Sequence, residues 1–347
     1  MTFFAVTAAV VLSACGAVSQ IAKRPQDPVD RPYKVETVRF PGGSGVTLAG
    51  ELTMPLAGDA FKAVVLVSGS GPQDRDEALA GHRPFLVLSD HLTRAGFAVL
   101  RYDDRGFGQS TGAFDTADLH DFAADAAGAF RFLAARPDVD ASSVGFIGQS
   151  EGGVIAPLAA DQVDPAFMVF LAAPARQLFP DVLATQLADI ARVEGASEAE
   201  IAASDTIVRD GSAILGRNAP LSQIRADLDA YLKSQGLGRT ERRTYLDQFA
   251  TRWGISHARH DPAAALRRLR MPVLALFGEK DLQVSATYEA PAMRAALRHP
   301  RSKVQVIGGA NHLFQPAGSG HPSEYEKIDI TLSTSVLNLI SDWMGAR

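Results

Sequence analysis

Runs of apolar residues recur along this chain, and stretches with helical spacing of apolar positions separate them. Near the N-terminus, residues 33–40 and 46–53 alternate polar and apolar positions on either side of the glycine-rich turn 42–45. This pattern predicts an antiparallel pair of half-buried strands. The later runs are apolar throughout, as expected for strands buried on both faces of a parallel sheet. They occupy residues 63–67, 97–100, 144–147, 166–171, 271–277 and 303–307.

The stretches between these strands have the spacing of amphipathic helices. In one of them Leu119, Phe122 and Ala126 fall on a single stripe, and Pro137 prevents the helix from continuing. Alternation of strands and helices predicts an α/β fold, with a doubly wound, mostly parallel eight-stranded sheet and helices on both faces. The helices predicted around this sheet are residues 85–95, 116–135, 154–160, 285–297 and 328–343.

The alternation stops between residues 176 and 270, where the pattern predicts helices and no strand. Their apolar stripes are typical of helix packing; the alternative is that some of them line an acyl pocket under a lid. We therefore divide the chain into a core, residues 33–175 and 271–347, and a helical cap, 176–270, inserted after the sixth strand. The cap helices are predicted at 181–193, 198–215 (with a capping box at Ser197 and Glu200), 221–232, 240–253 (closed by Gly254), and in a short helix that begins at Asp261 and Pro262.

Composition narrows the function classes only slightly. The chain has 347 residues, 21% of them charged, and a net charge of −5, which is typical of a globular enzyme and gives no reason to expect nucleic acid as a partner. It has no phosphate-binding loop and no dinucleotide fingerprint, so we expect no cofactor. Several histidines lack Cys or carboxylate partners at metal spacing and are interpreted as surface or core residues, which predicts no metal: His82, His91, His120, His257, His260 and His299.

The N-terminus has the features of an export signal. Residues 3–12 are apolar, uncharged and too short to span a bilayer, and Leu12–Cys15 resembles a bacterial lipobox. The resemblance implies a signal peptide over residues 1–14, cleavage before Cys15, lipidation of its thiol and a polar tether over 15–32. Gly16 favours the outer membrane, so the predicted location is the cell envelope with a lipid anchor. A plain signal peptide or a disordered start is the alternative, because no Lys or Arg precedes the apolar run.

Residues 148–153 form a G-x-S-x-G pattern between a predicted strand and a predicted helix. This is the arrangement of a nucleophile elbow, in which Ser150 occupies a sharp turn with strained, positive φ. Glycine at 148 and 152 removes side chains that would collide with the strand or the helix. The motif alone is short enough to occur by chance, and an ordinary Gly-rich turn is the alternative.

A serine hydroxyl needs a base, and the base needs an orienting carboxylate. Asp281 follows the strand 271–277, and His312 follows the strand 303–307. The carboxyl ends of neighbouring parallel strands face one crevice, so these side chains can meet Ser150 there. Glu279 remains an alternative for the acid, and His321 an alternative for the base.

Five motifs occur in the order found in α/β-hydrolases: S-G-S-G after the third strand, D-x-R-G-x-G-x-S after the fourth, G-Q-S-E-G, G-x-x-D and G-x-x-H. The chain therefore resembles the α/β-hydrolase superfamily. Residues 68–76, 102–106 and 149–153 are similar to bacterial serine esterases related to the acyl-peptidase and serine aminopeptidase branches. The resemblance implies Ser150 as nucleophile, His312 as general base and then acid, and Asp281 as its orienting group.

The resemblance also implies an oxyanion hole made of two backbone N–H groups, those of Glu151 and Ser70. Gly69 and Gly71 are the neighbouring alternatives to Ser70, because Ser68 and Gly69 stand where the family has His and Gly. Asp104 and Arg105 are interpreted as structural, fixing their loop through an ion pair, with a contact to the substrate as the alternative.

These features predict a serine hydrolase that cleaves carboxylic esters of small or medium acyl chains through an acyl-enzyme, with a small-molecule ester as its partner. One alternative is a peptidase that acts on acyl- or aminoacyl-peptides, although the predicted cap shows no residue that would hold a peptide terminus. Another is a non-catalytic binding lipoprotein, which the presence of all three triad residues disfavours.

Overall fold

The computed structural model describes residues 24–347 of the chain. The predicted signal peptide, Cys15 and the first part of the predicted tether lie outside the described residues. Lipidation of Cys15 therefore stays a prediction, and mass spectrometry of the mature N-terminus would contradict it by finding an unmodified thiol. No helix within the described range is both long and apolar enough to cross a membrane.

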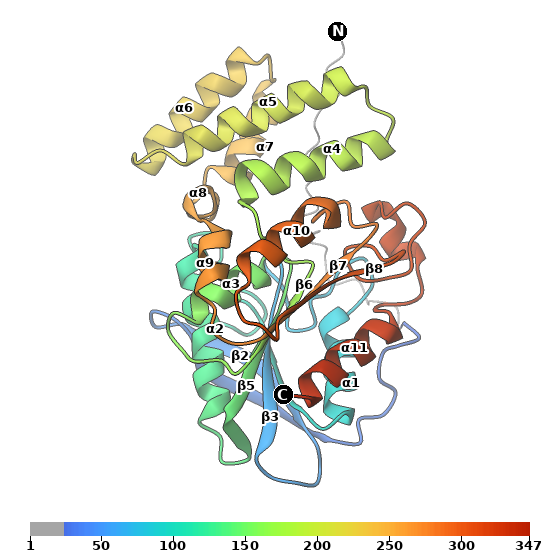
Figure 1. Cartoon of the computed structure of the whole chain (residues 1–347). Coiled ribbons are helices and arrows are strands. Elements are labelled where there is room, and N and C mark those ends of the chain that lie inside the picture. Colours follow the sequence, from blue (N-terminus) through green and yellow to red (C-terminus); the bar gives the residue numbers. More distant parts are fainter. Residues whose placement is uncertain (1–23) are drawn as a thin grey trace.

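An eight-stranded sheet forms the centre of the molecule, in the order β1-β2-β4-β3-β5-β6-β7-β8 (Figure 1). β2 is antiparallel to both β1 and β4, and all other neighbours are parallel. The fold class predicted from the sequence is confirmed, and so is each of the eight strands. Their bounds are β1 Lys34–Pro41, β2 Thr47–Met54, β3 Phe61–Val67, β4 Ala98–Tyr102, β5 Val139–Gln149, β6 Met168–Leu171, β7 Val273–Gly278 and β8 Lys303–Ile307.

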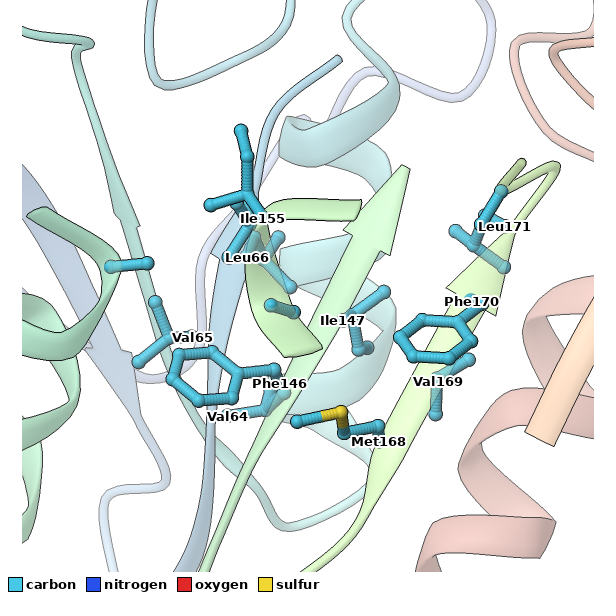
Figure 2. Close-up of a cluster of buried hydrophobic side chains, with 14 of the residues drawn as sticks. Val64, Val65, Leu66, Phe146, Ile147, Ile155, Met168, Val169, Phe170 and Leu171 are labelled. Carbon is cyan, nitrogen blue, oxygen red and sulfur yellow. The ribbon is translucent and has the colours of Figure 1, made fainter. Parts of the chain in front are cut away.

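The central strands are apolar because both of their faces are covered. Val64, Phe146, Met168 and Phe170 are fully buried, and Figure 2 shows these side chains gathered on β3, β5 and β6. Burial of each large apolar side chain contributes roughly 1.5–3 kcal/mol to folding. β3 and β5 are direct neighbours, with Val67 paired to Gly148. The loops that follow these two strands therefore emerge side by side at the carboxyl edge of the sheet.

Helices cover both faces of the sheet. α1 (Pro84–Arg94) and α11 (Thr334–Gly345) pack together on one face (Figure 1). On the other face lie α2 (Leu119–Ala134), α3 (Gly152–Ala159), α9 (Pro262–Arg268) and α10 (Ala286–Ala296). Because α9 packs against α3 and α10, the last helix of the predicted cap segment belongs with the core layer.

The helices α4 to α7 stand above the carboxyl edge of the sheet, and α8 lies between them and the core (Figure 1). A short kinked segment, Leu178–Val182, leads into them, and Phe179 within it has non-helical φ and ψ of −111° and 126°. The cap has its own apolar cluster, which includes Phe179, Leu215, Leu228 and Phe249. The helix bounds are α4 Leu183–Val193, α5 Glu198–Leu215, α6 Leu221–Ser234, α7 Arg239–Phe249 and α8 Arg252–Arg259.

The prediction of one helix over 240–253, closed by Gly254, is wrong. α7 ends at Phe249, and the Thr251 side chain caps a new helix, α8, by accepting a hydrogen bond from Gly254 N. Gly254 lies inside α8, where a Cβ would stand 1.9 Å from the carbonyl oxygen of Phe249. The glycine thus permits a close approach of the two helices.

The closing helix also begins later than predicted, at Thr334 instead of residue 328. The preceding backbone is engaged elsewhere, because the N–H groups of Thr331 and Leu332 donate to Gln26 Oε1 (2.7 and 3.0 Å). Arg24 donates to the carbonyl oxygens of Gly81 and Glu326. The described part of the predicted tether, from residue 24, is therefore held on the core.

Candidate active site

The nucleophile elbow has the predicted geometry. Ser150 stands between β5 and α3 with φ of +51°, and its N–H donates to the carbonyl oxygen of Leu171 (2.8 Å). A Cβ at Gly148 would lie 2.4 Å from the backbone of Gly152. A Cβ at Gly152 would lie 2.1 Å from the carbonyl oxygen of Val67. Both glycines are therefore required for the strand, turn and helix to approach this closely.

Asp281 and His312 meet at the carboxyl ends of β7 and β8. His312 Nδ1 lies 2.7 Å from Asp281 Oδ2, and both side chains are buried. The other Asp281 oxygen accepts from the N–H groups of Gln283 and Val284 (2.8 and 2.9 Å). The carboxylate is thus fixed, and a proton on Nδ1 leaves Nε2 as the basic atom of the ring.

Ser150 and His312 line one cavity. In the described structure no hydrogen bond joins the Ser150 and His312 side chains. Catalytic hydrogen bonds of this kind often form only when the substrate binds. The structure therefore brings the three predicted residues to one place, with the Asp–His contact already formed.

The two alternatives to this pair lie elsewhere. Glu279 is exposed and accepts a hydrogen bond from the N–H of Gly309 (2.7 Å). His321 contacts the Ser323 hydroxyl (2.8 Å) and Glu194 (3.3 Å). Neither lines the cavity that contains Ser150.

The loop after β3 supplies the candidate oxyanion hole. Gly69 N donates to Glu77 Oε1 (2.7 Å), so this donor is already occupied. Of the two remaining candidates, Ser70 lines the cavity and Gly71 does not. In the described structure the N–H groups of Ser70 and Glu151 donate to no protein acceptor, which leaves both free for an oxyanion.

Asp103 and Asp104 hold that loop in place from the end of β4. Asp104 accepts from the Ser68 hydroxyl (2.8 Å) and from Gln73 N (2.9 Å). Asp103 accepts from the guanidinium of Arg75 (2.6 Å).

The predicted structural role of Asp104 and Arg105 needs one correction, because they do not pair with each other. Arg105 pairs instead with Asp125 on α2 (2.6 Å), which ties the loop after β4 to that helix. Asp104 is left to hold the loop after β3.

The cavity beside Ser150 has a volume of about 960 Å³, part of it open to solvent. The cap contributes most of its apolar wall: Leu178, Phe179, Val182, Leu183, Phe249 and Trp253. The described lining contains no Lys or Arg, and Gln186 adds one polar side chain from α4. No group of three or more His, Cys, Asp or Glu side chains in residues 24–347 is arranged to hold a metal ion.

His257 is a site residue that sequence reasoning missed. It was interpreted as a surface or core histidine without a carboxylate partner, yet its Nε2 lies 2.7 Å from Glu151 Oε1. The two residues are more than a hundred positions apart, and His257 belongs to no motif. Trp253 ends the predicted helix 240–253, whose apolar stripe is typical of packing, and it likewise contacts Glu151 (2.6 Å). Only the placement of α8 over the elbow reveals either contact.

Comparison with known proteins identifies the family. Residues 83–315 match the family described as serine aminopeptidase, S33, and this range covers more than half of the chain. The chain belongs to this family. The matched range contains the elbow, Asp281 and His312, together with the whole cap. In this S33 protein the candidate triad therefore lies within the segment that defines the family.

Individual relatives of this S33 protein include esterases. The esterase EstD of Thermotoga maritima is 28% identical over 314 residues, which are 86% of this chain and 65% of EstD. The chain thus spans just under two thirds of that relative. The structure of the Pyrococcus furiosus esterase Pf2001 is 15% identical with a TM-score of 0.55, covering 90% of this chain and 91% of its own. A Thermogutta terrifontis esterase, determined with malate bound, is 22% identical with a TM-score of 0.51, covering 90% and 98%. At these identities the two structures show a shared fold.

Replacing Asp281 with Asn tests the proposed orienting role. The N–H groups of Gln283 and Val284 would hold the Asn oxygen, so its NH2 group would face His312 Nδ1 and favour the tautomer in which Nε2 carries the proton. We expect kcat for an ester substrate to fall by about 10⁴-fold. Glu279→Gln is the matched control, and it should stay within about twofold of the wild type. A large loss in Glu279→Gln, with Asp281→Asn active, would assign the acid to Glu279.

Glu77 makes the stability of this S33 protein depend on pH. Burial raises the pKa of its carboxyl to about 8, above the value of about 4.3 expected in the unfolded chain. The folded state then binds the proton more tightly than the unfolded state does. The free energy of unfolding therefore falls progressively as the pH rises from about 4.3 to 8. Glu77→Gln keeps an acceptor for Gly69 N and cannot ionise.

Thermal melts should show this difference. The quantity to compare is the Tm of Glu77→Gln minus the Tm of the wild type. We expect this difference to be more positive at pH 8 than at pH 5, by at least ~3 °C. The exposed Glu326 provides a control, since Glu326→Gln should leave the difference from wild type unchanged with pH. A flat difference for Glu77→Gln would show that the carboxyl ionises normally in the folded protein.

Proposed function

We propose that this S33 protein is a serine hydrolase that cleaves carboxylic esters through an acyl-enzyme intermediate. The observation that carries the proposal is the placement of Ser150, on a strained elbow, in the same cavity as a histidine already bonded to a buried carboxylate. The relationship to EstD, which is named as an esterase, supports the same activity.

The proposed reaction begins when Ser150 attacks the ester carbonyl and His312 Nε2 accepts its proton. Asp281 stabilises the imidazolium that results, because its carboxylate already accepts from Nδ1. The N–H groups of Ser70 and Glu151 bind the carbonyl oxygen as it gains negative charge. His312 then protonates the departing alcohol, and a water molecule activated by the same ring releases the acid and restores the serine.

The cavity favours a neutral acyl group. Its cap-derived wall is apolar, and its described lining contains no Lys or Arg that could bind a second carboxylate. Two carboxyl groups line it, but Glu151 is paired with His257. The raised pKa of Glu77, about 8 through burial, keeps that group neutral at pH 7. A free ammonium group, as in an aminoacyl-peptide, therefore lacks a counterion, which favours esters over aminopeptidase substrates.

A substrate panel tests this proposal. Purified protein is assayed with p-nitrophenyl esters from acetyl to dodecanoyl and with aminoacyl p-nitroanilides, and Ser150→Ala supplies the background rate. We expect turnover of the short and medium esters to exceed that of every anilide by at least about 100-fold in kcat/KM, a difference of roughly 2.7 kcal/mol. Preferential cleavage of anilides would favour the peptidase alternative, and no turnover above background would contradict both.

A further inference from the structure

The Glu151 side chain joins the elbow to the cap. It is buried, and its Oε1 accepts from Trp253 Nε1 (2.6 Å) and His257 Nε2 (2.7 Å). Glu151 directly follows the nucleophile, and its own N–H is one of the two candidate oxyanion donors. The residue thus presents its backbone to the reacting centre and its carboxylate to the cap.

The donors come from a closely packed part of the cap. Trp253 and His257 are four residues apart on α8, so they share a face, and their rings lie 4.7 Å apart. The indole of Trp253 also packs edge-on against Phe179 (6.1 Å) in the cap cluster.

α8 is fixed to the core as well. Arg252 pairs with Asp118 (2.7 Å), and the Ser256 hydroxyl accepts from Leu119 N (3.2 Å). The position of α8 is therefore determined by both the cap and the core. A shift of the cap can thus reach the core through this helix.

The electrostatics keep this contact strong. Burial opposes ionisation of Glu151, but His257 and Trp253, which both donate to the carboxylate, hold the pKa of this carboxyl below its usual range. An ionised acceptor makes shorter and stronger hydrogen bonds than a neutral one. The Glu151 carboxylate therefore connects one of the two candidate oxyanion donors to α8.

We propose that Trp253 and His257 are positioning residues, through which the cap sets the oxyanion hole by holding the Glu151 carboxylate. The inference rests on the proposed function. Neither residue takes part in proton transfer; each fixes the orientation of Glu151, and so the direction of its N–H. Because oxyanion donors act on the transition state, a loosened Glu151 should lower kcat and leave KM little changed.

The test compares three variants by steady-state kinetics on p-nitrophenyl butyrate. His257→Leu removes a donor, and we expect kcat to fall about 100-fold, as for loss of a strong hydrogen bond to a charged group. His257→Gln retains an N–H donor and should stay within about fivefold of wild type. Trp253→Phe keeps a ring without the donor and should lose about tenfold. KM should change less than about twofold in all three.

The inhibition constant of an alkyl trifluoromethyl ketone distinguishes a positioning role from a purely structural one. Ser150 adds to its carbonyl, the serine proton goes to His312, and the new oxyanion occupies the hole. Its Ki should rise in proportion to the loss in kcat/KM, whereas Ki for butyrate, the product acid, should stay constant. His260→Leu, at the end of the same helix, is the matched control and should resemble the wild type in every constant.

The other outcomes distinguish this inference from its alternatives and from the proposed function. A loss carried by KM would make His257 a substrate contact, and an unchanged ketone Ki would make the pair purely structural. If His257→Leu fails to fold, Trp253→Phe and His257→Gln still decide the question, because both retain a partner for the carboxylate. Absence of ester turnover and of fluorophosphonate labelling in the wild type would contradict the proposed function itself. If the wild type hydrolyses the ester and the variants have the same kinetic constants as the wild type, only this inference is contradicted.

Discussion

Ser150→Ala should abolish ester hydrolysis while leaving the protein folded. Alanine retains the Cβ that Ser150 already carries at φ of +51°, so the strain in the turn is the same in both proteins. Only the attacking oxygen is lost. We expect kcat to fall by at least about 10⁴-fold, to a background set by binding and the oxyanion hole.

The measurement is turnover of p-nitrophenyl butyrate, with a fluorophosphonate probe to report on the nucleophile directly. Wild-type protein should be labelled once, on Ser150, and Ser150→Ala should not be labelled. Ser335→Ala changes an exposed serine on α11 and should behave as wild type. Turnover that survives in Ser150→Ala would place the nucleophile elsewhere and remove the basis of the proposed function.

Gly152→Ala should have the largest effect on stability of any single methyl group added to the site. The new Cβ would stand 2.1 Å from the carbonyl oxygen of Val67, which belongs to the buried strand β3 and cannot move away cheaply. Either the start of α3 or the end of β3 must shift. We expect the free energy of unfolding to fall by roughly 3 kcal/mol or more, together with loss of activity.

Chemical denaturation measures this change, and Gly345→Ala provides the comparison. Gly345 lies at the end of α11, where an added Cβ meets no atom within 4 Å. That variant should change the free energy of unfolding by no more than about 0.5 kcal/mol. A Gly152→Ala protein with unchanged stability and activity would show that the elbow is less crowded than its geometry indicates.

The sheet was predictable from the sequence because each of its strands carries a local signal. Val64 and Phe146 lie in short apolar runs bounded by turn residues, and a run of that kind needs cover on both faces. The grouping of the three candidate catalytic residues was predictable for a related reason. Ser150, Asp281 and His312 each follow such a strand, and parallel strands bring their carboxyl ends to a common edge.

The two errors in helix bounds had different causes, one local and one distant along the chain. Gly254 suggests a helix end, but it lies inside α8 because Thr251 caps that helix and Phe249 approaches closely. The start of α11 was placed too early because Gln26, some three hundred residues away, binds the backbone at Thr331. The cap at Thr251 is a local signal that the glycine obscured, whereas the contact with Gln26 leaves no local pattern in the chain.

The sequence by itself determined the α/β fold, the elbow and the identity of the three candidate catalytic residues, because periodicity and motif spacing are local properties. Only the tertiary structure decided which N–H groups remain free for an oxyanion and which residues line the cavity beside Ser150. It also decided that Trp253 and His257 hold Glu151. These features depend on how the cap lies over the sheet, and that placement arises from packing and hydrogen bonds between segments with no fixed spacing along the chain.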